Sequence, residues 1–153
     1  MKFVAVEDVA APIALVWSHV ADLEAFEDRA RARIGAIQRR PPGPPAQGTV
    51  WSGKADVMGK KRDVTVTAAT IEAGARLTAE AATDGMQVNI DVDLAELGPR
   101  LTRLTVTTEA RARSLAARLM LQSAKLARKT LAKRYKGRIS DLAARIEKSA
   151  AKG

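Results

Sequence analysis

Apolar residues recur at steps of three and four along a C-terminal segment, residues 114–149, that contains no proline and only one glycine, Gly137. This spacing is typical of an α-helix, and the alanine, leucine, arginine and lysine that dominate the segment favour helices. The main stripe consists of Met120, Ala124, Ala127, Leu131, Tyr135, Ile139, Leu142 and Ile146. In the first half, Leu115, Leu119 and Leu126 add a second apolar set on another side, which widens the apolar arc. We therefore expect one long helix whose first half is deeply buried.

The middle of the chain consists of short runs in which apolar or β-branched residues alternate with polar ones. This pattern predicts a modest strand at residues 33–38 and then strands at 49–57, 62–71, 76–82, 86–94 and 101–108. The last five are joined by short connections, whereas parallel neighbours would need crossovers of about a dozen residues. We therefore predict an antiparallel meander, interrupted by a proline-rich loop at residues 41–48.

The amino-terminal region predicts one strand and two short helices. Residues 2–7 alternate weakly, and Pro12 is well placed to begin a helix. Asp22 is suited to cap a second helix, in which Glu27 lies near the start or on the solvent side. With the meander, these elements predict an α+β fold in which an antiparallel seven-stranded sheet wraps around the long C-terminal helix. We expect residues 1–153 to form a single domain of this kind.

Alternation also assigns the faces of the strands. In residues 86–94 the polar side chains of Gln87, Asn89, Asp91 and Asp93 share one face, and the apolar ones share the other. The long helix is the remaining amphipathic element that can cover the apolar face. Residues expected to point the same way from neighbouring strands are Val64, Val66, Leu104 and Val106.

Composition narrows the class of protein. The chain has 153 residues, of which 46% are apolar and 28% charged, which is ordinary for a globular domain. It has no cysteine and a single histidine, His19, so disulfides, thiolate metal sites and histidine-rich metal sites are excluded within one chain, and we expect no cofactor. No apolar run approaches the roughly 20 residues of a bilayer span, and acids interrupt the amino terminus, so we expect a cytoplasmic protein without a transmembrane segment.

The order of the elements resembles the helix-grip fold of the START-like superfamily, to which polyketide cyclase/dehydrase and Bet v 1-like proteins belong. The resemblance is carried by the stretch APIALVWSHVADLEAFE at residues 11–27, by Gly48-Thr49-Val50-Trp51 and by the run from Leu121 to Leu131. It implies an elongated cavity between the sheet and the terminal helix that holds an apolar or lipid-like small molecule. A minority of such proteins are enzymes, but the matched motif carries over no catalytic residue.

The predicted ligand site lies between the strand at residues 86–94 and the facing part of the long helix. Trp51 is expected either to line this pocket or to pack in the core, and Met58, Met86 and Met120 either to give it an adaptable wall or to fill gaps. The predicted ligand-binding residues are Trp51, Val64, Val66, Met86, Val88, Ile90, Leu104, Val106, Met120, Ala124, Ala127 and Leu131.

Two sets of titratable residues are candidates for catalytic groups. His19 is the one side chain that titrates naturally near neutral pH, but nothing in the sequence pairs it with a partner, so we favour a solvated or interface histidine. Asp91 and Asp93 lie about 7 Å apart on one strand face, a spacing compatible with paired-carboxylate hydrolysis. Because the opposite face is apolar and needs the interior, we favour a solvated pair, and no catalytic residue is assigned.

The net charge of +9 is concentrated at the C-terminal end, where residues 111–153 hold 13 lysines and arginines against two acids. Arg118, Lys125, Lys129 and Lys136 lie within a narrow sector of the predicted helix. Such a ridge could bind RNA, the ribosome or an anionic membrane surface, although basic residues are also common on solvated helix faces.

The sequence therefore favours non-enzymatic binding of an apolar or lipid-like small molecule, with polyanion binding by the basic ridge as one alternative. A cyclase- or hydratase-type enzyme is another, which would need an inward-facing acid or base. A helix of 36 residues would extend about 54 Å, too long for the groove of a compact domain. We therefore expect the part beyond Gly137 to bend, to fray or to pack on a second copy through Ile139, Leu142 and Ile146.

Overall fold

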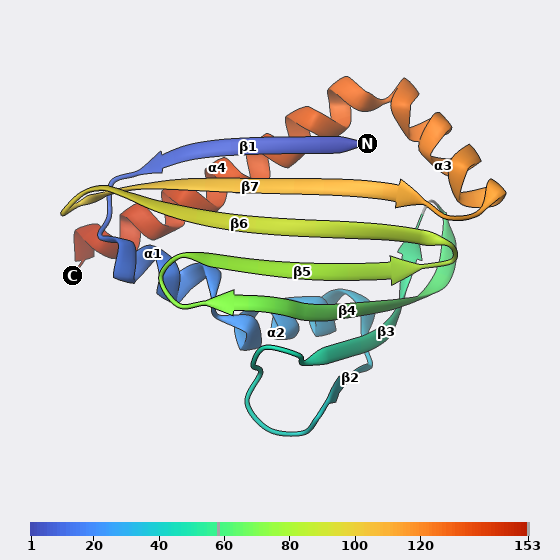
Figure 1. The fold of residues 1–153 in the computed structure, drawn as a ribbon, viewed down its shortest axis with the longest axis horizontal. Helices are drawn as coiled ribbons and strands as arrows, with labels where there is room; N and C mark the ends of the chain where they lie inside the picture. Colours follow the sequence, from blue (N-terminus) through green and yellow to red (C-terminus); the bar gives the residue numbers. More distant parts are fainter. Residues whose placement is uncertain (58, 153) are drawn as a thin grey trace.

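The computed structural model describes residues 1–57 and 59–152, so Met58 lies outside the described residues. In this part of the chain, seven strands and four helices follow the predicted order, except that the terminal helix is divided in two (Figure 1). The elements are β1 (Lys2–Val9), α1 (Ile13–Val20), α2 (Leu23–Ile34), β2 (Ile37–Arg40), β3 (Val50–Val57), β4 (Lys60–Glu72), β5 (Arg76–Thr83), β6 (Met86–Gly98), β7 (Leu101–Ala112), α3 (Leu115–Leu126) and α4 (Arg128–Lys152).

The strands form one antiparallel sheet in the order β1-β7-β6-β5-β4-β3-β2. β1 pairs with β7 along its whole length, from Lys2 opposite Glu109 to Val9 opposite Thr102, which brings the first strand beside the last. The predicted α+β class and the seven-stranded antiparallel sheet are confirmed. Most strands extend a few residues beyond their predicted ends.

The core lies between the sheet, α1 and α4. Val16 of α1, Leu104 of β7 and Ile146 of α4 are each 0% exposed and belong to one apolar cluster. Tyr135 fixes α4 to the sheet, since its hydroxyl donates to the carbonyl oxygen of Val106 at 2.9 Å. α4 is therefore the helix that the sheet holds, and Figure 1 shows it passing behind β7 and β6.

The predicted long C-terminal helix is present as α4, but the prediction that residues 114–149 form one unbroken helix is wrong. α3 ends at Leu126, and α4 begins at Arg128 in a different direction (Figure 1). The expected deep burial of the first half is wrong as well, because α3 lies beyond the end of β7 instead of across the apolar face of the sheet. Three leucines of α3 are left facing solvent, with Leu115 73%, Leu119 56% and Leu126 92% exposed.

The start of α3 is fixed at the turn between β5 and β6. Gly85 occupies this turn with φ 76°, a left-handed conformation that favours glycine. Its carbonyl oxygen accepts a hydrogen bond from the Arg113 backbone N–H at 2.6 Å. The next residue, Ser114, caps α3 by accepting from the Ala117 N–H at 3.1 Å. A β-carbon at Gly85 would collide with the Ser114 side chain, so the turn and the helix start are packed against each other.

The second half of the terminal segment also differs from its prediction. Gly137 lies inside α4, which continues to Lys152, so the bend precedes this glycine and does not follow it. Ile139 and Leu142 pack against the core of their own chain, and Ile146 is fully buried there. These three residues, which were predicted to pack on a second copy, instead pack in the core of their own chain. They therefore give no support to a helix-mediated dimer.

Candidate ligand-binding cavity

A cavity of about 440 Å³ lies between the sheet and the helices α1, α2 and α4. Strands β3 to β7 supply its floor, α2 supplies a wall, and Ile139 and Leu142 of α4 close part of the opposite side. Apart from Glu27 and Ser52, all side chains that line it are apolar, with Gly53 adding backbone. A volume of this size and an apolar lining with few polar groups are typical of small-molecule sites.

The structure divides the predicted ligand-binding residues into two groups. The six that line the cavity are Trp51, Val64, Val66, Ile90, Leu104 and Val106. They share the apolar face of β3, β4, β6 and β7, as the alternation of those strands indicated. Their role in binding stays a prediction.

The other six predicted residues lie outside the cavity lining, and for each the position in the fold gives the reason. Met86 and Val88 begin β6, and Met86 borders a shallow depression near the β5–β6 turn instead. Met120 and Ala124 belong to α3, which does not cross the sheet, and Ala127 is exposed at the break. The sixth, Leu131, lies on α4 near the break, whereas the cavity is lined by Ile139 and Leu142 further along that helix.

The α2 wall was missed by the sequence analysis. Leu23, Glu27, Ala30 and Ile34 all line the cavity, and they follow one another at steps of four, three and four. That spacing places them on one face of a helix. The same spacing shows that Glu27 belongs to the apolar face, so the solvent side, one of the two positions predicted for it, is wrong. Only 7% of its side chain is exposed.

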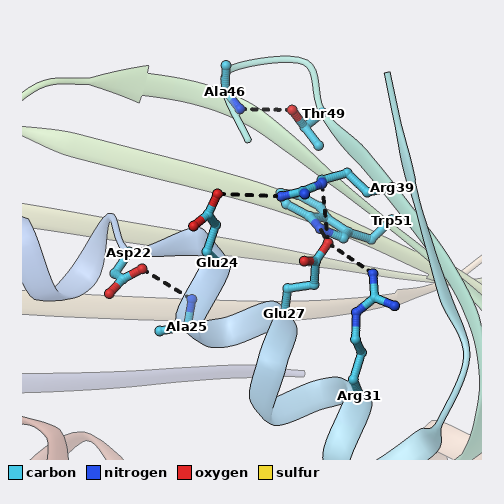
Figure 2. Close-up of polar contacts among 9 residues, drawn as sticks. All are labelled: Asp22, Glu24, Ala25, Glu27, Arg31, Arg39, Ala46, Thr49 and Trp51. Carbon is cyan, nitrogen blue, oxygen red and sulfur yellow. Dashed lines mark hydrogen bonds and ion pairs between the residues drawn. The ribbon is translucent and has the colours of Figure 1, made fainter. Parts of the chain in front are cut away.

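Glu27 is held by three side chains that reach it from α2, β2 and β3. The Trp51 indole donates a hydrogen bond from Nε1 to Glu27 Oε1 at 2.9 Å. Arg39 Nε and Arg31 Nη2 lie 3.5 Å and 3.6 Å from the same oxygen. Figure 2 shows these contacts converging on one oxygen of the carboxylate, with Arg39 also facing Glu24. A buried carboxylate needs such compensation, because leaving it unpaired would be costly.

The other carboxylate oxygen of Glu27, Oε2, has no hydrogen-bond partner in the part of the chain that the structure describes. Glu27 is also the one ionisable side chain in the cavity lining given by those residues. Glu27 therefore adds one carboxylate residue to a cavity lining that is otherwise almost entirely apolar. Trp51 lies in the cavity lining, which was one of the two positions expected for it, and its indole N–H also donates to the Glu27 carboxylate.

The paired aspartates do not reach the cavity. Asp91 and Asp93 lie on the outer face of β6, where both approach Arg76 of β5. The hydrogen bond from Arg76 lowers the pKa of Asp91. Desolvation, followed by the neighbouring Asp91, raises the pKa of Asp93. These shifts belong to a surface ion pair, as the face assignment indicated.

His19 and the basic ridge also lie apart from the cavity. His19 is half-buried on α1 and does not line it. Arg118 and Lys125 are exposed on α3, whereas Lys129 and Lys136 are exposed on α4, so the break at Ala127 divides the predicted ridge between two helices. Within residues 1–57 and 59–152, no three histidine, cysteine, aspartate or glutamate side chains gather where they could hold a metal ion. No helix in those ranges is both long and apolar enough to cross a bilayer.

The chain belongs to the polyketide cyclase/dehydrase and lipid transport family, whose sequence profile matches residues 1–147. This confirms the resemblance to START-like proteins, and the fold is the helix-grip fold. No curated protein sequence matches the chain.

Solved structures share this fold at low sequence identity. Norcoclaurine synthase from Thalictrum flavum matches with a TM-score of 0.68 and 12% identity, over 100% of this chain and 87% of that one. The Zhui aromatase/cyclase from Streptomyces sp. R1128 matches with a TM-score of 0.64 and 18% identity, over 96% and 93%. A START superfamily protein from Mycobacterium smegmatis matches with a TM-score of 0.57 and 19% identity, over 92% and 98%. At such identities the likeness describes the fold.

Proposed function

We propose that this protein binds a mainly apolar small molecule in the cavity, without catalysing a reaction on it. The observation that carries the proposal is an apolar cavity of about 440 Å³ whose lining, among the described residues, includes one buried acidic side chain, Glu27. Most of a ligand's surface would meet aliphatic side chains, which favours hydrocarbon or aromatic bodies. A lipid-like molecule fits the family's description.

The free oxygen of Glu27 narrows the chemistry of the ligand. Oε1 is already engaged by Trp51 and two guanidinium groups, whereas Oε2 is available to accept a hydrogen bond. An apolar ligand that carries one hydroxyl or amine group would place its donor there. A ligand without a donor would leave that oxygen desolvated and unpaired, which opposes its binding.

A cyclase-type reaction is the second candidate, and one observation favours it. Such a reaction needs an acid or base at the cavity, and Glu27 is an ionisable residue in the cavity lining. Two of the similar structures are named as a synthase and an aromatase/cyclase. We favour binding because, among the described residues that line the cavity, Glu27 has Ser52 as its only polar companion, and Ser52 is not ionisable.

Filling the cavity tests the binding proposal. The protein should bind an apolar fluorescent probe that carries one amine group, such as a naphthylamine, with fixed stoichiometry, and the probe should raise its melting temperature, because it binds the native state selectively. Ala79→Phe places a ring in the cavity lining and should weaken probe binding by at least about tenfold. Fluorescence titration and thermal melts measure both effects.

The matched control for Ala79→Phe is Ala82→Phe on the same strand. Ala82 is exposed and does not line the cavity, so this variant should bind the probe as the parent does. Equal binding by all three proteins would place the probe elsewhere on the surface and contradict the proposal. Absence of saturable binding to the parent would also contradict it.

A further inference from the structure

Helix α3 has two apolar faces, and only one of them meets the rest of the protein. Ala117 is 0% exposed on the inner face, where partly buried Met120, Leu121 and Ala124 accompany it. The outer face carries Leu115, Leu119 and Leu126. Because each residue turns a helix by about 100°, these three leucines lie within an arc of about 40°. They form a continuous outward stripe, which we call the α3 leucine stripe.

The surroundings of the α3 leucine stripe are strongly basic. Arg118 and Lys125 lie on one flank of the stripe, and both are exposed. Between Glu109 and Asp141 the chain carries ten lysines and arginines and no acidic residue. Exposed leucines beside a dense group of cations are the pattern of a helix that lies in the plane of a membrane interface. Phosphate headgroups would meet the cations while the leucines enter the acyl boundary.

We propose that α3 docks this protein on anionic lipid membranes through the α3 leucine stripe and the flanking cations. α3 has 12 residues and is held at its start by the Ser114 cap and the β5–β6 turn, so it is presented as a preformed helix. The contact is peripheral, with the helix lying parallel to the surface. It does not depend on the ligand in the cavity.

Two other occupants of this surface fit the observations less well. A second copy of the chain would bring two basic α3 regions together, and like charges oppose that contact. Nucleic acid would satisfy the cations but would leave the leucines in water, and aromatic residues, on which unpaired bases stack, make up only 3% of the chain. A membrane surface satisfies both the cations and the leucines.

Co-sedimentation with vesicles tests the proposal. The parent protein should bind vesicles of phosphatidylcholine and phosphatidylserine in equal parts, and bind phosphatidylcholine vesicles much more weakly. Replacing Leu115, Leu119 and Leu126 with serine should lower partitioning by at least about tenfold, because the apolar contribution to binding is lost. A matched control replaces Leu97 and Leu101 with serine, since these leucines are 46% and 39% exposed at the opposite end of the sheet.

The charge contribution needs its own variant. Arg118→Glu with Lys125→Glu should also lower partitioning by about tenfold or more, and rising salt should weaken the binding of the parent. Circular dichroism and thermal melts should be unchanged in all variants, because every substituted side chain is exposed.

Four outcomes would overturn the membrane proposal. One is no binding to anionic vesicles at low salt. A second is equal loss in the leucine variant and in its control. A third is binding of a single-stranded RNA probe that only the charge variant weakens, together with vesicle binding that is the same in the leucine variant as in the parent. The fourth is a dimer in sedimentation that the leucine variant dissociates. An empty or filled cavity changes none of these readouts, so they are independent of the proposed ligand.

Discussion

Ile146→Asp will unfold the protein, whereas Leu126→Asp will leave it folded. Both residues belong to the basic C-terminal segment, but Ile146 is 0% exposed in the core cluster and Leu126 is 92% exposed. An unpaired carboxylate in an apolar core costs several kcal/mol, comparable to a total stability of about 5–15 kcal/mol. A charge at an exposed position changes the free energy of unfolding by about 0.5 kcal/mol or less.

Urea denaturation followed by tryptophan fluorescence measures the free energy of unfolding of both variants. The comparison is sharp because the two substitutions are chemically similar and occupy the two halves of the terminal segment. A loss of several kcal/mol in Leu126→Asp would mean that α3 packs on the protein through its leucines in solution. The α3 leucine stripe would then not be free to bind a membrane.

The break at Ala127 is the reason that one helix with a buried first half was predicted for the terminal segment, where the structure has two helices. Neither proline nor glycine marks it, and apolar residues keep their helical spacing across it. Burial depends on where the helix lies, and α3 is held at the β5–β6 turn while α4 is held by the core cluster. Periodicity identifies an apolar face but does not say whether another element covers it. The leucines of α3 therefore looked like core residues.

The strand side of the cavity was predictable because alternation in an antiparallel sheet fixes which face a side chain takes. Val64, Val66 and Ile90 needed only that rule, and all three line the cavity. The α2 side was missed because an acid was interpreted as a solvent-side residue. Trp51 and Arg39, which compensate the carboxylate of Glu27, are 24 and 12 residues away in the sequence. Such partners emerge only when the chain folds.

Glu27→Ala should cost about 2–4 kcal/mol of stability, an unusually large effect for a glutamate. The substitution leaves the Trp51 N–H and the Arg39 guanidinium without their shared acceptor, and the Arg39 side chain is only 24% exposed. Removing one member of a buried polar cluster is costly because the remaining members stay desolvated. Glu24→Ala is the control, since Glu24 Oε1 lies 3.9 Å from Arg39 Nη1 but the Glu24 side chain is 64% exposed. This substitution should cost less than about 1 kcal/mol of stability.

Glu27→Gln separates the structural role of this residue from its proposed role in binding. Glutamine keeps an acceptor for the Trp51 N–H, so most of the stability should return relative to Glu27→Ala. Its amide nitrogen then replaces Oε2, so an aromatic amine, whose nitrogen is a poor acceptor, would meet a donor where it met an acceptor before. Binding of a naphthylamine should therefore weaken by about tenfold, while naphthalene, which has no donor, should bind at least as tightly as it does to the parent, because a neutral amide costs less to desolvate than a carboxylate. Fluorescence titration measures both. Equal weakening of the two probes would mean that Glu27 only shapes the cavity, and no weakening of either would mean that its free oxygen does not face the ligand.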